Sequence, residues 1–370
     1  MAETPGTISL GQGMVAYGPP EQAMIAARQF PQSDAEHRYG RVEGLPELAS
    51  MFEAKLAAEN AIVVRPHSRV VITAGSNLGF MNAVMAIADP GDEFIFPLPY
   101  YFNHCMAVTM ASCRVVGVPT QADYQLDVDA IARAITPRTR AVVTCSPNNP
   151  TGAVYSEASL RAVNALCRDR GVFHIHDEAY EYFTYDGARH FSPGSIEGAQ
   201  AHTLSFFSFS KNYGMASWRV GYVVYPADLF DAMNKVQDTN LICAPVPSQL
   251  LALQALQQGR ALVEPKIAQL ARVRASVHAA LAELGDLVQF PRTQGAFYVL
   301  MKLPGVAEAL AFNQAMTERH KVATIPGFAF GLTDTRAANY QRLSYGALDA
   351  DTVAEGVKRY VAAVRDWYKV

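Results

Sequence analysis

The sequence has few cysteines, and their spacing matches no shared site. Five cysteines occur among 370 residues. None falls in a CxxC pair or in the spacing of a zinc site, and an odd number cannot be fully paired in disulfides. We therefore expect a reduced, cytoplasmic protein with no metal site. The cysteines are Cys105, Cys113, Cys145, Cys167 and Cys243.

Net charge and long hydrophobic runs are also scarce. The formal net charge is -3 at pH 7, which gives no reason to expect nucleic acid or an anionic membrane as the main partner. No apolar run reaches the length that spans a bilayer. The opening MAETPGTISLGQGMV is too short and too acidic for a secretory signal. We therefore expect neither nucleic acid nor membrane among the partners.

Short β-rich runs alternate with helical patterns between Ser68 and Pro226. Continuous apolar strands separated by helices are typical of a mostly parallel sheet covered on both faces. With 50% hydrophobic residues, the chain can bury a large core in two lobes. We predict a three-layer α/β/α domain with a mostly parallel (mixed), seven-stranded sheet. The predicted strands are RVVITAG, DEFIFPLP, CRVVGVP, RAVVTCS, VFHIHDEAY, LSFFSFS and RVGYVVYP.

The pattern changes after Pro226. A helix-rich connection is followed by a smaller α+β unit, with strands predicted in GAFYVLMKL, KVATIPG and YQRLSYGA and a last helix near the C-terminus. Neither repeats nor a low-complexity linker occur. The sequence therefore predicts an N-terminal arm that contributes to the small domain (residues 1–40), a large domain (residues 41–275) and a small C-terminal domain (residues 276–370).

Polar residues follow several of the predicted strands. In open α/β sheets, ligands bind at the carboxyl ends of the strands, so these residues are candidates for one shared site. They are Gly75, Ser76 and Asn77 after the first strand, Asn148 and Asn149 after the fourth, Asp177, Glu178 and Tyr180 after the fifth, and Ser208, Ser210 and Lys211 after the sixth.

The chemistry of this set indicates a pyridoxal phosphate site. Gly75 and Ser76 stand where a strand turns into a helix; such a pair is also an ordinary helix start, but its free N–H groups bind phosphate. Arg219 can add a bidentate phosphate contact. Asp177 ends an apolar strand, where a buried carboxylate needs a cationic partner such as a protonated ring nitrogen. Lys211 supplies the amine for a Schiff base.

Five motifs, in order along the chain, resemble those of one enzyme family. SFSKNYGMASWRVGY resembles its lysine motif, SPNNPTG its asparagine motif and HDEAYEYF its aspartate and tyrosine motif. YGRVEGLPEL and QRLSYGA resemble its N-terminal tyrosine and C-terminal arginine motifs. The family is that of the pyridoxal-phosphate-dependent aminotransferases of class I/II, in the aspartate aminotransferase superfamily of fold type I. The resemblance covers nearly the whole chain and implies pyridoxal 5'-phosphate as the cofactor.

The resemblance also implies roles for single residues. Lys211 is the catalytic Schiff-base lysine, and Asp177 pairs with the pyridine nitrogen and keeps it protonated. Tyr180 and Asn149 hydrogen-bond the phenolic oxygen of the ring, and Tyr101 stacks on the ring. The residues implied to hold the phosphate are Gly75, Ser76, Asn77, Ser208 and Arg219.

Substrate and subunit contacts follow from the same resemblance. Arg342 is implied to bind the α-carboxylate of the substrate, assisted by Asn149 and the backbone at Gly13. Tyr39 is implied to reach the phosphate of a neighbouring subunit, so we expect a homodimer with shared active sites.

Three further ionisable residues lie in or next to the aspartate motif. Glu178 is expected to point away from Asp177 and to be structural. His174 and His176 alternate on one strand, but no third ligand has a matching spacing, so a metal site is not favoured. We expect both histidines in the core, with His176 as a candidate to support Asp177.

The predicted reaction transfers an amino group from an L-amino acid to a 2-oxo acid by a ping-pong mechanism, with Lys211 moving the proton. Two alternatives stay open. The same cofactor and fold also support lyase chemistry such as C–S β-elimination. Aminotransferase-like domains also act as ligand sensors in transcription regulators, and we expect no DNA-binding segment here.

The segments expected at the substrate mouth are GQGMVAYGPP, SNLGFMNAVM and PLPYYFNHCM, and they contain no lysine or arginine. They offer apolar and aromatic side chains, which favour a neutral or aromatic donor because burying an unpaired carboxylate is costly. One of the adjacent residues Tyr100 and Tyr101 is expected only to pack. Arg41 is the cation that would instead support an aspartate-preferring enzyme. The expected mouth residues are Met14, Tyr17, Tyr100, Tyr101 and Phe102, with His104 as an ionisable candidate.

Overall fold

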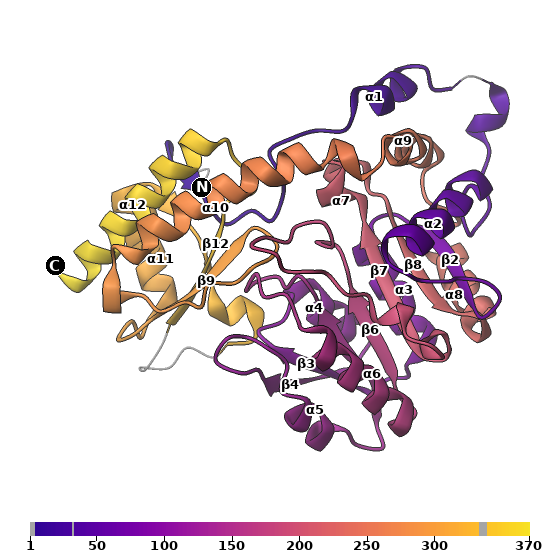
Figure 1. The fold of residues 1–370 in the computed structure, drawn as a ribbon, viewed down its shortest axis with the longest axis horizontal. Helices are drawn as coiled ribbons and strands as arrows, with labels where there is room; N and C mark the ends of the chain where they lie inside the picture. Colours follow the sequence, from indigo (N-terminus) through magenta and orange to yellow (C-terminus); the bar gives the residue numbers. More distant parts are fainter. Residues whose placement is uncertain (1–3, 32, 333–338) are drawn as a thin grey trace.

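A computed structural model describes residues 4–31, 33–332 and 339–370 and contains the predicted seven-stranded sheet (Figure 1). The strand order is β2-β8-β7-β6-β5-β3-β4. Within this sheet, β8 runs opposite to the other six strands, which are parallel to one another, so the mostly parallel, mixed sheet is confirmed. The strands are β2 (Ser68–Thr73), β3 (Glu93–Leu98), β4 (Arg114–Pro119), β5 (Thr139–Cys145), β6 (Phe173–Asp177), β7 (Thr203–Ser208) and β8 (Gly221–Pro226).

Alternating side chains of the strands pack against helices on both faces of the sheet. On β2, Val70 and Ile72 join a buried cluster with α2 and α9, whereas Val71 joins a cluster with α3, α4 and α8. Successive residues of a strand point to opposite faces, so the three-layer architecture is confirmed. The helices of this unit are α1 (Glu21–Arg28), α2 (Pro46–Glu59), α3 (Ser76–Ile87), α4 (Phe102–Met110), α5 (Val128–Ala134), α6 (Glu157–Arg170), α7 (Phe209–Asn212), α8 (Phe230–Leu241) and α9 (Val246–Gln257).

The C-terminal part of the chain forms a smaller α+β unit. Its antiparallel sheet has the order β11-β12-β9. A short strand near the N-terminus, β1, pairs with β10, so segments near both ends of the chain lie in this unit (Figure 1). The elements are β1 (Ile8–Ser9), β9 (Tyr298–Leu303), β10 (Val322–Ala323), β11 (Ile325–Pro326), β12 (Asn339–Ser344), α10 (Glu264–Ala282), α11 (Ala309–His320) and α12 (Ala350–Tyr368).

The segment KVATIPG differs from its prediction as one strand. It forms two short strands because the chain changes partner within it: β10 pairs with β1, and β11 pairs with β12. The predicted domain limits (residues 1–40, 41–275 and 276–370) remain a prediction, and the first three residues of the predicted arm lie outside the described residues.

The strand directions gather distant segments at one edge of the large sheet. The carboxyl ends of β2, β5, β6 and β7 meet at this edge, because β2 and β7 both run opposite to β8. The antiparallel strand β8 contributes its beginning instead, which brings Arg219 to the same place. The sheet therefore places Gly75, Asn149, Asp177 and Lys211 around one point.

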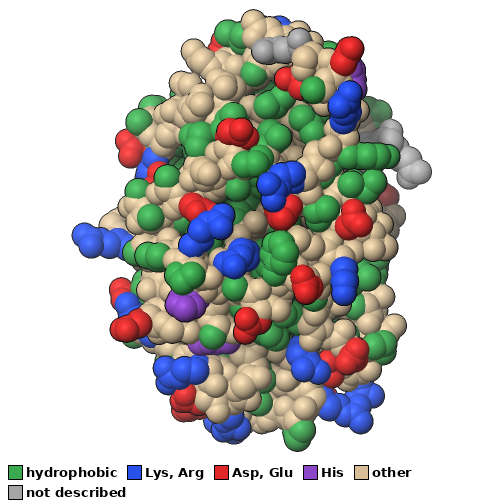
Figure 2. Space-filling model, turned by 90° about the vertical axis from the view of Figure 1, so that its right-hand side faces the viewer, with side chains coloured by type: hydrophobic (Ala, Val, Ile, Leu, Met, Phe, Trp, Pro, Cys, Tyr) green, Lys and Arg blue, Asp and Glu red, His purple; other side chains and the backbone are tan. Residues whose placement is uncertain are grey.

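The face of the molecule shown in Figure 2 carries both signs of charge, with hydrophobic side chains between them. Cationic and anionic groups are interspersed there, and no patch of one sign dominates the view. Within the described ranges, no helix is long and apolar enough to cross a membrane.

Candidate active site

A cavity of about 130 Å³ lies at the carboxyl edge of the large sheet. It brings together most of the residues predicted to bind the cofactor. Gly75, Gly13, Arg342 and Tyr39 do not line it, although the first three lie beside residues that do. The lining residues are Ser76, Asn77, Tyr101, Cys145, Asn149, Asp177, Ala179, Tyr180, Ser208, Ser210, Lys211, Ala216 and Arg219.

One end of the cavity is built to receive an anion. Helix α3 begins at Ser76, so its free N–H groups open at this end. Gly75 has a φ of 81°, and a Cβ on it would lie 2.2 Å from Nη2 of Arg219. Only glycine therefore lets the guanidinium approach the start of the helix. Ser208 caps α7, with Oγ accepting a hydrogen bond from the Ser210 N–H at 3.2 Å.

Lys211 projects into the cavity from α7. Its Nζ donates a hydrogen bond to the carbonyl of Gly13. Burial lowers the pKa of Lys211 from 10.5 to about 8, and the charges of Arg219 and Arg342 act in the same direction, while Asp177 opposes them. The hydroxyl of Tyr17 donates to the backbone carbonyl of Lys211 at 2.8 Å. A larger fraction of the amine is therefore neutral and nucleophilic near physiological pH than in an ordinary lysine.

Asp177 ends β6 and is held on two sides. Its Oδ1 accepts a hydrogen bond from the Ala179 N–H at 3.0 Å, and its Oδ2 lies 3.1 Å from Nε2 of His104. The His104 ring is buried and stacks on Phe80 at a centroid distance of 4.1 Å. The expectation of His104 at the substrate mouth was therefore wrong. It reaches Asp177 from helix α4, a contact that the strand pattern could not show.

The two alternating histidines of β6 serve the core instead. Nε2 of His174 and Nδ1 of His176 both contact Oγ1 of Thr144, at 2.8 and 2.7 Å. Burial lowers the pKa of His174 to about 3 and that of His176 well below its usual value, so both rings are neutral. His176 does not support Asp177 as proposed from the sequence; His104 does.

Two buried phenols meet beside the cavity, which Tyr180 lines and Tyr298 does not. The hydroxyls of Tyr180 and Tyr298 are 2.6 Å apart, and Nδ2 of Asn149 lies 3.5 Å from the Tyr180 hydroxyl. Burial raises the pKa of Tyr180 well above its usual value, so it stays a hydrogen-bond donor. Sequence reasoning found Tyr180 but missed Tyr298, which comes from β9 in the small unit.

Arg342 of β12 is buried beside these phenols. Its Nη1 donates to Oδ1 of Asn149 at 2.8 Å, and its Nη2 donates to the carbonyl of Gly11. The guanidinium carbon lies 4.6 Å from the ring centroid of Tyr298 and 5.0 Å from that of Phe330. Two aromatic rings and two hydrogen bonds therefore fix the plane of the guanidinium.

The adjacent residues Tyr100 and Tyr101, which follow β3, lie in different surroundings. Tyr101 lines the cavity, and its hydroxyl accepts a hydrogen bond from Nδ2 of Asn103 at 2.8 Å. Tyr100 instead packs beside Phe96 and Gly331. Tyr39 lies outside the cavity with 82% of its surface exposed.

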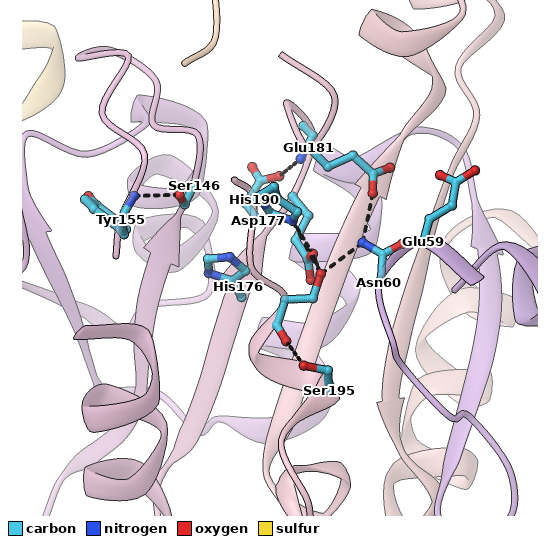
Figure 3. A network of polar contacts seen from close by, with 12 residues as sticks. Glu59, Asn60, Ser146, Tyr155, His176, Asp177, Glu181, His190 and Ser195 are labelled. Carbon is cyan, nitrogen blue, oxygen red and sulfur yellow. Dashed lines mark hydrogen bonds and ion pairs between the residues drawn. The ribbon is translucent and has the colours of Figure 1, made fainter. Parts of the chain in front are cut away.

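A buried polar network supports the segment that carries Asp177 and Tyr180 (Figure 3). Glu181 bonds to Nζ of Lys55 at 2.5 Å and to Nδ2 of Asn60 at 2.9 Å. Its other oxygen accepts from Asn212, the residue after Lys211, at 3.3 Å.

Glu178 enters the same network from the other side. It contacts Ser192 and His190, and Ser192 in turn accepts from Asn60 at 2.9 Å. Glu178 thus points away from Asp177 into this network, as expected from the sequence. The network therefore connects the segments on both sides of the cavity.

The residues present fit pyridoxal phosphate. The cradle at Gly75 suits a phosphate, Asp177 suits a ring nitrogen that keeps its proton, and Lys211 can form the covalent link. Nε of Arg342 has no hydrogen-bond partner among the described residues, so the guanidinium retains capacity for a further anionic ligand.

The similarity to known proteins extends over almost the whole chain. The family model "Aminotransferase class I and II" matches residues 5–359. The aromatic aminotransferase ISS1 of Arabidopsis thaliana is 36% identical over 94% of this chain and 87% of its own length. A probable aspartate/prephenate aminotransferase of Aquifex aeolicus is 32% identical over 97% of this chain and 91% of its own length.

A solved structure agrees with this assignment. The crystal structure of an aromatic aminotransferase from Pyrococcus horikoshii matches with a TM-score of 0.91 at 30% identity, covering 100% of this chain and 98% of that one. Together with the lysine, aspartate and arginine gathered at the sheet edge, these similarities lead to one assignment. The chain belongs to the class I and II aminotransferases of fold type I, and it is a pyridoxal-phosphate-dependent enzyme that transfers amino groups.

Proposed function

We propose that this aminotransferase takes its amino group from an L-amino acid with a neutral or aromatic side chain and passes it to a 2-oxo acid at the cavity described above. The main observation behind the proposal is that Arg342 is buried without an anionic partner among the described residues. Its residue surface is 2% exposed, and no carboxylate of the described residues lies within ion-pair distance. A buried guanidinium without an anion is unfavourable. The α-carboxylate of an amino acid would supply the missing anion.

The planar guanidinium of Arg342 suits a two-point contact with that carboxylate. Asn149 is positioned to assist, because it already contacts both Arg342 and Tyr180. This arrangement would hold the carboxylate at one end of the cavity while the amino group faces Lys211. Orientation of this kind accounts for a large share of catalysis in two-substrate reactions.

Lys211 is proposed to be both the attachment point and the proton carrier. Its lowered pKa lets the amine attack as a neutral group and then accept and return a proton at the substrate Cα. The Gly13 carbonyl orients the free amine. When bound, pyridoxal phosphate supplies the electron sink and carries the amino group between the two half-reactions.

Asp177 is proposed to hold a proton on the ring nitrogen of the cofactor. Its carboxylate is fixed by the Ala179 N–H and by His104, so it cannot turn away from the cavity. Tyr180 is proposed to hydrogen-bond the phenolic oxygen, with Asn149 as a second contact, and Tyr101 to stack on the ring.

The phosphate is proposed to sit at the start of α3. The N–H groups of Ser76 and Asn77 and the side chains of Ser208 and Arg219 face this end of the cavity. Gly75 is proposed to assist through its backbone, since it lets Arg219 approach. A helix start and a guanidinium together match the charge and the geometry of a phosphate.

The donor preference rests on the residues around the cavity entrance. Tyr17 is fixed to the backbone of Lys211, Met14 is 39% exposed, and Phe102 packs against Phe330. These side chains are apolar or aromatic and offer no charge to a distal carboxylate. They favour methionine, leucine or an aromatic amino acid as the donor.

One cation near this entrance was missed from the sequence. Nζ of Lys266, on α10, lies 4.3 Å from the ring centroid of Tyr17. Lys266, or Arg41 from a partner subunit, would support aspartate as the donor instead. The relatives' names include both aromatic and aspartate/prephenate aminotransferases, and they do not favour the lyase alternative.

A homodimer in the cytoplasm is proposed as the working form. The side chain of Tyr39 is exposed to solvent. It can therefore reach a second subunit, as the family resemblance implies. Met85, Met106 and Met110 expose apolar surface on α3 and α4, which an interface would cover. A catalytically competent monomer at assay concentration would contradict this proposal.

An amino-donor screen tests the substrate proposal. Loss of the absorbance of lysine-bound cofactor would be followed in single turnovers with methionine, leucine, phenylalanine, tyrosine and aspartate, and turnover would then be measured with 2-oxoglutarate or pyruvate. We expect the neutral and aromatic donors to give the higher kcat/KM. The proposal fails if aspartate is best and either Lys266→Ala or Arg41→Ala removes that preference.

A further inference from the structure

Tyr298 occupies the junction of the two units and has no role in the proposed function. It is the first residue of β9, where it pairs with Ser344 of β12, and it is 1% exposed. Its position lets one side chain touch the residues on both sides of the substrate site. Its hydroxyl and its ring make different contacts, so their effects can be separated.

The hydroxyl of Tyr298 contacts Tyr180 and no other hydrogen-bond partner in the described part of the chain. A phenol has a single proton to donate. If Tyr180 gives its proton to the phenolic oxygen of the cofactor, the 2.6 Å contact between the two hydroxyls must be donated by Tyr298. Chains of hydrogen bonds strengthen one another in a buried site.

The same hydroxyl limits the residue at position 13. A Cβ on Gly13 would lie 2.5 Å from the Tyr298 hydroxyl oxygen. Any larger side chain would therefore push the segment away, and this segment accepts the hydrogen bond from Lys211. Tyr298 thus contacts Tyr180 directly and lies against Gly13, whose carbonyl accepts the hydrogen bond from Lys211.

The ring of Tyr298 forms one face of the pocket around Arg342. The guanidinium carbon lies 4.6 Å from its centroid, with Phe330 on another side at 5.0 Å. Nε of Arg342 has no hydrogen-bond partner among the described residues, so the two rings and the hydrogen bonds from Nη1 and Nη2 together hold the head group. A buried cation over an aromatic face is stabilised by the ring quadrupole.

We propose that Tyr298 is a positioning residue with two separable actions: its hydroxyl directs the Tyr180 hydroxyl toward the cofactor, and its ring holds Arg342 for the substrate carboxylate. This inference rests on the proposed roles of Tyr180 and Arg342. It adds a residue from the small unit to the site and explains why an aromatic with a hydroxyl, rather than phenylalanine, stands at the start of β9.

Tyr298→Phe removes the hydroxyl and keeps the ring. A hydrogen bond donated to the phenolic oxygen stabilises its negative charge, so weakening that bond disfavours the deprotonated form of the lysine-bound cofactor. The pH midpoint of its absorbance change should rise by about 0.5–1 unit. The KM for the amino acid should stay within about twofold of wild type, because the ring remains.

Tyr298→Leu removes both actions. It should shift the absorbance midpoint as Tyr298→Phe does, and should also raise the KM for the amino acid by about tenfold. Tyr360→Phe is the matched control, since its buried hydroxyl has no hydrogen-bond partner in the described ranges. The control should match wild type in absorbance midpoint and KM.

Each possible result either supports or overturns one part of the inference. A Tyr298→Phe midpoint equal to wild type and to Tyr360→Phe would overturn the hydroxyl action, whatever the fate of Tyr298→Leu. A KM for Tyr298→Phe as high as for Tyr298→Leu would overturn the separate action of the ring. A wild-type enzyme without pH-dependent cofactor absorbance would instead overturn the proposed function of the site, and the inference with it.

Discussion

The two ends of the cavity are assembled in different ways. The proposed phosphate end uses residues that directly flank strands of the large sheet: Gly75 after β2, Ser208 at the end of β7, and Arg219 before β8. The proposed carboxylate end combines Arg342 of the small unit with Asn149 of the large sheet and the N-terminal segment. One end therefore depends on local chain geometry, and the other depends on how the two units pack. Substitutions at the two ends should therefore have separable effects on cofactor binding and on substrate binding.

The largest loss of activity is expected from a substitution at Asp177, which lies between the two ends of the cavity. Asp177→Asn keeps the size of the side chain but cannot hold a proton on the ring nitrogen. We expect cofactor binding to persist and kcat to fall by about 10³-fold, or roughly 4 kcal/mol. Absorbance titration with cofactor and steady-state kinetics measure the two effects. Near-normal kcat in the variant would remove Asp177 from its proposed role.

The network below the site should matter for stability rather than for chemistry. Lys55→Met leaves Glu181 buried without its cation, and breaking a buried pair in this way costs about 3 kcal/mol. Chemical denaturation should show this loss. The double variant with Glu181→Leu should recover much of it, because neither charge then remains unpaired. A double variant as unstable as Lys55→Met would show that packing, not charge, explains the effect.

The carboxylate end is tested by Arg342→Lys. Lysine keeps the charge but loses the planar, two-point contact and the fit between the rings of Tyr298 and Phe330. We expect kcat/KM for the amino acid to fall by about 30–100-fold, while affinity for the cofactor stays unchanged. An equal loss of cofactor affinity would mean that Arg342 serves the phosphate end as well.

The phosphate end is tested by Gly75→Ala. The added Cβ meets Nη2 of Arg219 and must also adopt a φ of 81°, so backbone and guanidinium are both displaced. We expect about tenfold weaker cofactor binding, measured by titration of the apoenzyme, with KM for the amino acid unchanged. Gly91→Ala is the control, because it has a similar φ of 91° but nothing within 4 Å of its Cβ.

The same contrast explains what could be predicted from the sequence. The alternating strands and helices fixed the sheet, and the rule that ligands bind at carboxyl ends of strands located Lys211, Asp177 and Asn149. Such inferences need only the order of elements along the chain. Tyr298 and Lys266 could not be found in this way, because each reaches the site through the packing of the small unit.

His104 and His176 show a limit of another kind. From the sequence, His176 is adjacent to Asp177 and His104 is far from it, yet His104 makes the contact. Successive strand residues face opposite sides, so adjacency argues against His176. The rotation of helix α4 onto the sheet decides which of its residues meets Asp177, and no local pattern encodes that rotation.

The smallest change in rate is expected from a change of pH without any substitution. The pKa of Lys211 is lowered to about 8, so the neutral amine that reacts with the cofactor increases as pH rises through this value. Reconstitution of the apoenzyme should accelerate about threefold between pH 7.5 and 8.5. The folded chain also binds fewer protons than the unfolded chain between pH 8 and 10.5, so this group adds stability to the apoenzyme as pH rises there. A flat rate across pH 8 would contradict the lowered pKa.

We expect the cofactor to be attached to Lys211 at the carboxyl edge of the large sheet. Borohydride reduction of the cofactor-loaded enzyme makes the bond between lysine and cofactor permanent, and peptide mapping then identifies the modified residue. The expected result is a phosphopyridoxyl group on Lys211 alone, and none after Lys211→Ala. Stoichiometric labelling of any other lysine, Lys266 included, would contradict it.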